Sequence, residues 1–228
     1  MTRSSNTFKV AIIDYQMGNM FSVQHACDQA CLSSFITSDR EEIQRADGAI
    51  LPGVGAFGEA MQNLKRLDLI DVIKEFISSG KPFMGVCLGL QLLFTESEEF
   101  GKSRGLDIVR GSVIKFPSID YNGKKLKVPQ IGWNRIHRPK GCDDDLWEGS
   151  PLQEVMSGAY MYFVHSYYAV PNSLSAVLST TNYGNVDYCS SLLIDNVFAT
   201  QFHPEKSALE GIAVYKKWAD ISQRVKEN

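Results

Sequence analysis

Apolar and polar stretches alternate through the first hundred residues in a way that predicts strands followed by helices. Phe8–Ile13 is a short, nearly continuous apolar run, typical of a strand buried on both faces of a parallel sheet. After it, Val23, Cys27 and Cys31 share apolar positions with the spacing of one helical face, so both cysteines are expected in the core. A metal site joining His25 to these cysteines is the less favoured alternative, because His25 lies off that face and no fourth ligand is near.

Three further apolar runs have the length of buried strands: Ser33–Thr37, Gly48–Leu51 and Pro82–Val86. Between the first two, Ser38 and Glu41 form a capping-box pattern that predicts a short helix. An amphipathic stretch predicts one helix from Gly58 to about Ser79, ended by Gly80. A further helix is expected from about Leu88. This alternation is typical of a doubly wound α/β sheet.

The second half of the chain is richer in strand-forming residues, with Gly, Asn and Pro between the runs. Five strand-like segments are predicted: Val109–Phe116, Lys124–His137, Tyr160–Val170, Ala176–Tyr183 and Ser190–Gln201. A second capping-box pattern, from Ser207 to Glu210, predicts a C-terminal helix through about Arg224. We therefore expect a single α/β domain over residues 1–228, in which helices flank a mainly parallel central sheet with added antiparallel strands.

Composition excludes several classes of protein. The 228 residues are 44% hydrophobic and 21% charged, as in ordinary globular proteins, and the net charge of -3 argues against a nucleic-acid partner. The sequence contains no signal-peptide pattern and no apolar run of bilayer-spanning length, which predicts a cytoplasmic protein without a membrane partner. Five cysteines without a CxxC pair indicate neither a disulfide framework nor a metal site.

The strongest chemical signal is a cysteine between two glycines. Cys87 is central in the sequence Gly85-Val86-Cys87-Leu88-Gly89, between a predicted strand and a predicted helix, which is the pattern of a nucleophile elbow. The two glycines permit a sharp turn that presents the thiol at the sheet edge, and the helix N-terminus is expected to favour the thiolate. A buried structural cysteine is the alternative interpretation.

A thiol nucleophile needs a base, and His203 is the best placed of the four histidines. It follows the apolar strand predicted over Val197–Phe202, and Glu205 lies two residues further on. If the Glu205 carboxylate reaches the His203 ring, it can orient and charge this histidine, the base that activates Cys87.

The segment after the strand Gly48–Leu51 fits two functions. Gly53-Val54-Gly55-Ala56-Phe57-Gly58 satisfies the G-x-G-x-x-G pattern of dinucleotide-binding proteins, which makes an oxidoreductase a remote alternative. However, the following strand ends in Cys87, where a dinucleotide site would have an acidic residue. We favour a glycine-rich loop whose backbone N–H groups face a developing oxyanion.

Together these segments resemble the class I, triad-type glutamine amidotransferases. The resemblance rests on Gly85–Gln91, on Pro52–Gly55 and on His203-Pro204-Glu205, which have the order and spacing of that family. The segments Gly132-Trp133-Asn134 and Tyr162–Tyr167 resemble, within it, the glutaminase subunits of imidazole glycerol phosphate synthases. The likeness covers nearly the whole chain.

The resemblance implies a role for each matching residue and no cofactor or metal. Cys87 would attack the carboxamide carbon of L-glutamine, His203 would protonate the departing ammonia, and Glu205 would hold His203. The backbone N–H groups of Val54 and Leu88 would form the oxyanion hole. Glutamine would be bound by Gly53, Gly55, Gln91, Glu99, Ser166 and Tyr167.

The resemblance also implies a partner, a (β/α)₈-barrel cyclase subunit of histidine biosynthesis that forms a heterodimer with the chain and receives the ammonia. Trp133, Asn134 and Tyr162 are the expected interface residues. The loop Gly53–Gly55 is expected to be misaligned in the isolated chain and corrected by docking.

Three positions depart from the family pattern: Gln16, Ile131 and Ala199. They leave open a paralogous subunit that supplies ammonia for the amidation of a surface-polysaccharide sugar. A catalytically silent regulatory or scaffolding module is a further alternative, and it requires an unreactive Cys87.

Overall fold

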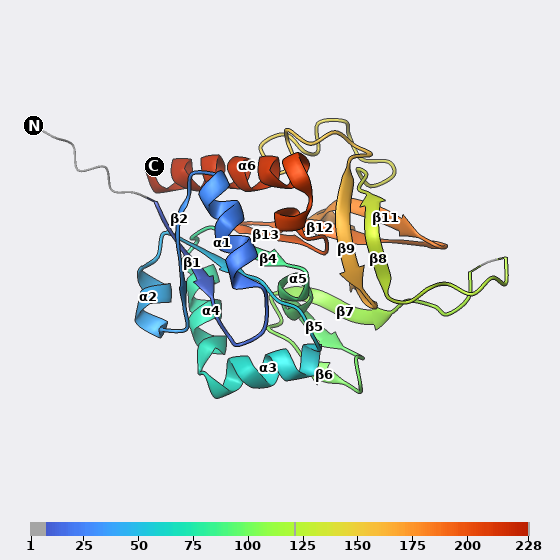
Figure 1. Cartoon of the computed structure of the whole chain (residues 1–228), viewed down its shortest axis with the longest axis horizontal. Coiled ribbons are helices and arrows are strands. Elements are labelled where there is room, and N and C mark those ends of the chain that lie inside the picture. Colours follow the sequence, from blue (N-terminus) through green and yellow to red (C-terminus); the bar gives the residue numbers. More distant parts are fainter. Residues whose placement is uncertain (1–7, 121, 228) are drawn as a thin grey trace, which may run out of the picture.

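A central sheet organises the computed structural model of the chain, which describes residues 8–120 and 122–227. Its parallel part consists of β1 (Lys9–Ile13), β2 (Ser33–Thr37), β3 (Gly48–Leu51), β4 (Phe83–Val86) and β13 (Val197–Thr200). In space these strands follow the order β2-β1-β3-β4-β13 (Figure 1). The last strand of the sheet along the chain therefore lies beside the fourth, and their carboxyl ends meet at one edge.

Antiparallel strands extend the sheet beyond β13. They are β12 (Val186–Ile194), β11 (Val177–Tyr183), β10 (Tyr167–Pro171), β7 (Val109–Lys115), β5 (Phe94–Ser97) and β6 (Ser103–Arg104), of which β5 and β7 pair in parallel. A separate two-stranded ribbon pairs β8 (Gln130–Arg135) with β9 (Tyr160–His165). The predicted fold class, a parallel centre flanked by helices with antiparallel strands added, is confirmed.

Helices cover both faces of the sheet (Figure 1). On one face lie α1 (Met20–Gln29) and α6 (Ala208–Glu227); on the other lie α2 (Arg40–Arg45), α3 (Phe57–Arg66), α4 (Leu69–Ser78) and α5 (Leu88–Leu92). Two 3₁₀ turns, η1 (Leu174–Ala176) and η2 (Pro204–Lys206), complete the elements. Among the described residues, no helix is both long and apolar enough to cross a bilayer.

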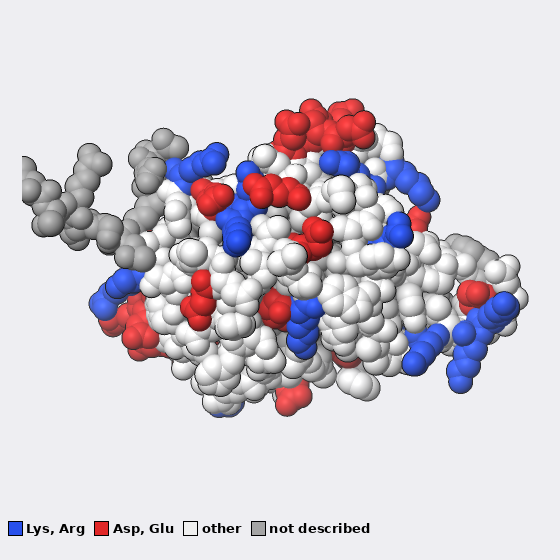
Figure 2. Space-filling view, turned by 45° about the horizontal axis from the view of Figure 1, so that its top comes forward, with Lys and Arg blue, Asp and Glu red and all other residues white. Residues whose placement is uncertain are grey.

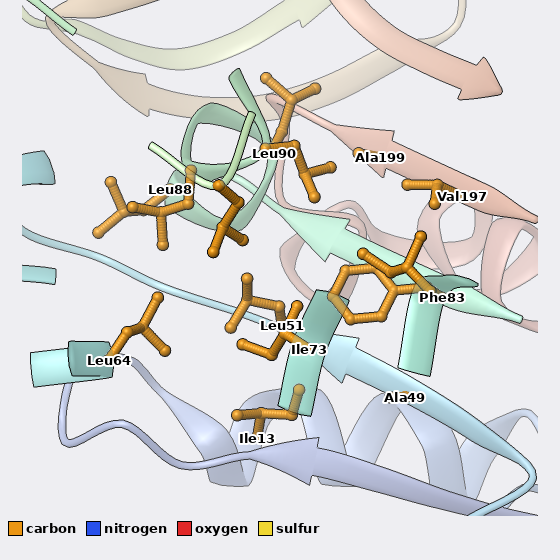
Figure 3. Close-up of a cluster of buried hydrophobic side chains, with 14 of the residues drawn as sticks. Ile13, Ala49, Leu51, Leu64, Ile73, Phe83, Leu88, Leu90, Val197 and Ala199 are labelled. Atoms are coloured by element: carbon orange, nitrogen blue, oxygen red, sulfur yellow. The ribbon is translucent and has the colours of Figure 1, made fainter. Parts of the chain in front are cut away.

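Two hydrophobic clusters, one on each face of the sheet, form the core. Successive side chains of a strand point to opposite faces, so β1 sends Ala11 and Ile13 to one cluster and Val10 and Ile12 to the other. Figure 3 shows the first cluster, in which Leu88 from α5 packs with residues of β1, β3, β4 and β13. This packing anchors the helix that follows Cys87.

The prediction that both cysteines of α1 are buried is wrong for Cys31. α1 ends at Gln29 with Ala30 as its C-cap, and Cys31 lies beyond it with φ 59° and an exposed side chain. Cys27 is fully buried, as expected. A left-handed residue after the C-cap ends many helices, because it turns the chain away from the helix axis.

The predicted single helix from Gly58 to Ser79 is two helices. Asp68, with φ 54°, turns the chain between α3 and α4. Leu64 before the break and Leu69 after it are both fully buried, so the apolar pattern continues across a change in helix direction. Periodicity alone therefore did not reveal the break.

Neither predicted capping box acts as one. The N-cap of α2 is Asp39, not Ser38, and its carboxylate accepts the Glu42 N–H at 2.9 Å. The Ser207 hydroxyl instead donates to the His203 carbonyl at 2.6 Å and accepts the Tyr162 N–H at 3.0 Å. Ser207 thus ties the turn after β13 to β9.

Candidate active site

Three segments that are distant in the sequence meet at one edge of the sheet, because β3, β4 and β13 are parallel neighbours. The loop after β3 contains Gly53, the residue after β4 is Cys87, and the chain beyond β13 reaches His203. Ligands bind at this edge in open α/β sheets. The Cys87 N–H donates to the Thr200 carbonyl at 2.7 Å, which joins the β4 and β13 segments directly.

Cys87 occupies a strained turn. Its φ of 55° and ψ of -103° lie outside the regions that non-glycine residues favour, and such strain is common at functional sites. Side chains at the flanking positions would not fit. A Cβ at Gly89 would clash with the Leu51 carbonyl, and one at Gly85 would come within 3.1 Å of the Gly89 backbone. The turn and its two glycines have the form of a nucleophile elbow.

His203 is paired with Glu205 in the interior. Its Nδ1 lies 2.7 Å from Oε1 of Glu205, and both side chains are only 3% exposed. Burial by itself lowers the pKa of His203, but the negative charge of the neighbouring Cys87 and the hydrogen bond to Glu205 outweigh it and raise the pKa to about 10. The ring is therefore an imidazolium at neutral pH.

His203, and not the short helix α5, is the charged partner that faces Cys87. α5 has five residues, too few for the N-terminal effect expected from the sequence to be large. Nε2 of His203 is buried and has no hydrogen-bond partner of ordinary geometry among the described residues. With Nδ1 held by Glu205, this nitrogen is the one free to exchange a proton near the sulfur.

A cavity of about 340 Å³ opens beside Cys87, within the roughly 300–1,000 Å³ usual for small-molecule sites. Eight of the residues predicted for the site line it: Val54, Gly55, Cys87, Leu88, Gln91, Glu99, Ser166 and Tyr167. Pro129, Val164 and His165 complete the lining. Three other residues predicted for the site, Gly53, His203 and Glu205, are not part of the lining.

Gln201 is a buried residue that the sequence reasoning missed. Its Nε2 lies 3.7 Å from Sγ of Cys87, and its Oε1 accepts from Nε2 of Gln91 at 2.9 Å. Gln91 also donates to the Tyr167 carbonyl at 2.9 Å, and Nδ1 of His165 lies 2.8 Å from the same oxygen. A chain of amides thus runs from the sulfur to β10. Side chains alternate between the two faces along β13, and continuing this alternation past Thr200 turns Gln201 inward like His203. This pattern was the signal in the sequence that could have identified Gln201.

The loop Gly53–Gly55 closes the place where an oxyanion would form. The Gly53 carbonyl accepts the Leu88 N–H at a distance of 3.4 Å. One of the two predicted oxyanion donors is therefore occupied by a protein oxygen. Val54 is 41% exposed, and Gly55 has φ 108°. The peptide between Gly53 and Val54 must turn before both N–H groups can face the cavity.

Known proteins with similar sequences point to the same enzyme family as this geometry. The family model for class-I glutamine amidotransferases matches residues 11–217. The chain is 45% identical to imidazole glycerol phosphate synthase subunit HisH of Syntrophotalea carbinolica, over 93% of this chain and 100% of that protein. It is 44% identical to the HisH protein of Aquifex aeolicus, over 95% and 99%.

The chain belongs to the class-I glutamine amidotransferases, in the HisH family. The predicted family and enzyme class are confirmed. A glutamine amidotransferase of Thermotoga maritima has the same fold, with TM-score 0.60 at 15% identity over 98% of this chain and 87% of the other. PurLQS of the same organism aligns with TM-score 0.64 at 16% identity, over 96% of this chain and 99% of the other.

This amidotransferase carries its predicted interface residues on the β8–β9 ribbon. Trp133 and Tyr162 are cross-strand neighbours with ring centroids 6.2 Å apart, and Trp133 is 52% exposed. The Asn134 side chain, unlike the Trp133 ring, is hydrogen-bonded within the chain: its Nδ2 donates to the Asn182 carbonyl at 2.8 Å. The Tyr162 carbonyl accepts the His203 N–H at 2.9 Å, so the ribbon is bonded directly to the histidine of the site.

A dinucleotide does not suit the loop after β3. The first N–H of α3, at Phe57, donates to Oε2 of Glu99 at 2.7 Å. A carboxylate therefore occupies the position in which a dinucleotide-binding helix would receive a pyrophosphate. The amidotransferase family and this contact together leave no support for the oxidoreductase alternative.

Within residues 8–120 and 122–227, no group of three or more His, Cys, Asp or Glu side chains could hold a metal. On the face in Figure 2, Asp and Glu side chains gather in one patch at the top, and elsewhere Lys and Arg lie among Asp and Glu.

Proposed function

We propose that this chain hydrolyses L-glutamine to glutamate and ammonia at Cys87 and delivers the ammonia to a synthase partner. The observation that carries the proposal is the buried alignment of the Cys87 thiol, the His203 imidazole and the Glu205 carboxylate beside a cavity of about 340 Å³. We assign residues 1–228 to one glutaminase domain, since β13 pairs with β4 in the centre of the sheet.

The first step forms a thioester. The Cys87 thiolate attacks the carboxamide carbon, and the carbonyl π electrons move to oxygen, where the Val54 and Leu88 N–H groups stabilise the charge. The intermediate then collapses, the C–N bond breaks, and His203 transfers its Nε2 proton to the departing nitrogen. The raised pKa of His203 supports this role, because it keeps the ring protonated at neutral pH.

The second step hydrolyses the thioester. The neutral His203 takes a proton from water, whose oxygen attacks the acyl carbon, and collapse expels the Cys87 thiolate and leaves glutamate. Gln91, Glu99, Ser166 and Tyr167 all line the cavity, and we assign these groups to the amino-acid end of glutamine. Glu99 supplies the negative charge that suits an ammonium group.

The occupied oxyanion position supports partner control of the glutaminase. While the Gly53 carbonyl accepts the Leu88 N–H, the intermediate loses a donor whose absence typically costs about 10²–10³ in rate. Free ammonia is mostly ammonium at neutral pH and is not nucleophilic, so a glutaminase active without its partner would waste glutamine. We assign the partner as a (β/α)₈-barrel cyclase of histidine biosynthesis and the complex as a cytoplasmic heterodimer.

The β8–β9 ribbon is the proposed docking surface. Ile131 is 58% exposed, Trp133 52% and Tyr160 49%, an apolar surface of the kind that marks protein contacts. A shift of Tyr162 on docking would reach His203 through a single backbone hydrogen bond.

Glutamate release, measured with and without the cyclase subunit, tests the proposal. We expect turnover to rise by at least 10² on addition of the partner, and Cys87→Ser to abolish it in both states. Cys142→Ser, which removes an exposed thiol, is the matched control and should retain full turnover. Equal turnover with and without the partner would refute partner control, and activity in Cys87→Ser would refute the assigned nucleophile.

The acceptor of the ammonia separates histidine biosynthesis from sugar amidation. With a cyclase partner and its ribulosyl-formimino nucleotide, glutamine consumption should match the formation of imidazole glycerol phosphate. A paralogue devoted to sugar amidation would instead leave the nucleotide unchanged. A silent scaffold would give no Cys87 adduct with a diazoketone analogue of glutamine, even with the partner bound.

A further inference from the structure

Tyr15 places a hydroxyl in the interior of the protein, just after β1. The side chain follows β1, is 0% exposed, and its Oη has no hydrogen-bond partner among the described residues. Leaving a buried hydroxyl unpaired is unfavourable, and such groups in folded proteins call for an explanation. No step of the proposed chemistry uses it.

The Tyr15 hydroxyl lies directly against Gly53 of the oxyanion loop. A Cβ at Gly53 would clash with Oη of Tyr15 and would lie 3.0 Å from Cβ of Leu88. On the other side, a Cβ at Gly18 would come within 3.4 Å of the Gly53 Cα. Gly53 is therefore enclosed by the β1–α1 connection and by α5, and glycine is required because the hydroxyl fills the side-chain position.

The negative charge of Cys87 also acts on Tyr15. Burial is the main reason that the Tyr15 pKa is far above its ordinary value of 10, and the Cys87 charge raises it further. The hydroxyl thus stays protonated and can donate. It lies close both to the loop Gly53–Gly55, which must turn, and to Cys87, the nucleophile.

We propose that Tyr15 is a positioning residue whose hydroxyl receives the Gly53 carbonyl when the Gly53–Val54 peptide turns out of the oxyanion hole. The carbonyl then has two hydrogen-bonding positions. In the present one it accepts from Leu88 and leaves Tyr15 unpaired. In the other it accepts from Tyr15, the Leu88 N–H is freed, and the Val54 N–H faces the cavity.

This arrangement limits the free-energy difference between the two states, which the partner must overcome when it docks. Each state has one bond to the Gly53 carbonyl, and the turn is a rotation of one peptide flanked by a glycine. Without the Tyr15 hydroxyl the turned carbonyl would be buried and unpaired. The equilibrium would then move back toward the state in which the Gly53 carbonyl accepts the Leu88 N–H.

Tyr15→Phe tests the inference, which rests on the proposed glutaminase function. The substitution removes only the hydroxyl. Four quantities are measured for the full chain: kcat and KM for glutamine without and with the cyclase subunit, the rate of Cys87 alkylation by iodoacetamide, and Tm. Ser222→Ala is the matched control. Its hydroxyl is also buried and has no hydrogen-bond partner within the described part of the chain. It lines a cavity with Gly80 and Pro82, before β4, at the opposite end of that strand.

We expect Tyr15→Phe to lower kcat of the isolated chain by up to about tenfold, which corresponds to about 1.4 kcal/mol. KM should stay within twofold, because the loop acts on the intermediate. The complex should lose no more than the isolated chain, since the partner already favours the turned loop. Alkylation, which needs no oxyanion hole, should be unchanged. Tm should be equal or higher, because an unpaired hydroxyl has been removed from the resting state.

Other results would overturn the inference. A kcat within twofold of wild type in both states would show that the hydroxyl does not position the loop. A parallel loss of kcat, alkylation rate and Tm would show a merely structural role, and so would a tenfold loss in Ser222→Ala. Absence of glutaminase activity in the wild-type complex would instead refute the proposed function, whatever Tyr15→Phe does.

Discussion

His165, which forms part of the cavity wall, should make the protein unusually sensitive to acid. Burial lowers its pKa from the ordinary 6.5 to about 4, against the opposing effect of the bond from Nδ1 to the Tyr167 carbonyl and with a small contribution from the charge of His203. Phe116, Phe163 and Tyr188 surround the ring. The neutral imidazole is therefore built into the fold.

The sign of the effect follows from where the proton binds. Above pH 6.5 the ring is neutral in both folded and unfolded chains, and its full contribution to stability is present. As the pH falls from 6.5 to 4, the His165 ring binds a proton in the unfolded chain but not in the folded chain, so the free energy of unfolding decreases. At about 1.4 kcal/mol per tenfold change in proton affinity, the loss totals about 3 kcal/mol. This is a large part of the roughly 5–15 kcal/mol by which domains are stable.

The measurement compares urea unfolding of wild type and His165→Gln from pH 7.5 to pH 4. The variant should be less stable at pH 7.5, but the difference should shrink by about 2–3 kcal/mol at pH 4, because only the wild type carries this titration. His25→Asn, which removes an exposed histidine from α1, controls for the loss of one imidazole. Parallel stability curves for wild type and His165→Gln would refute the reasoning, since they would show that His165 takes up its proton equally in both states.

Three further outcomes follow from single contacts. Cys31→Gly should stabilise the chain by about 1 kcal/mol in urea unfolding, because Cys31 is held at φ 59°, and Cys31→Ala, which keeps a Cβ, should not. Gly89→Ala should destabilise by about 2 kcal/mol or more, since its Cβ would clash with the Leu51 carbonyl; an unchanged denaturation midpoint would contradict the elbow geometry. Glu205→Gln should lower kcat by roughly 10²–10⁴ with little change in KM, and a loss below tenfold would exclude Glu205 as the partner that charges His203.

Local sequence patterns predicted the elements around the site well. The strand Gly48–Leu51 has the observed bounds, and β4 and α5 begin within a residue of expectation. The predictions failed where tertiary contacts override a local pattern. Ser207, a plausible cap, instead bonds to His203 and Tyr162, and the apolar face shared by α3 and α4 conceals the turn at Asp68.

The sequence by itself determined which chemical groups exist and how they are spaced along the chain: a thiol between glycines, a histidine two residues from a carboxylate, and a glycine loop after a buried strand. Such short-range features depend only on backbone sterics and hydrophobic periodicity. Only the tertiary structure decided that Gln201 lies against Cys87, 114 residues away, and that the Gly53 carbonyl takes the Leu88 N–H. These contacts arise from the pairing of β3, β4 and β13. Strand pairing buries surface from distant parts of the chain, and no local pattern encodes which polar atoms it brings within bonding distance.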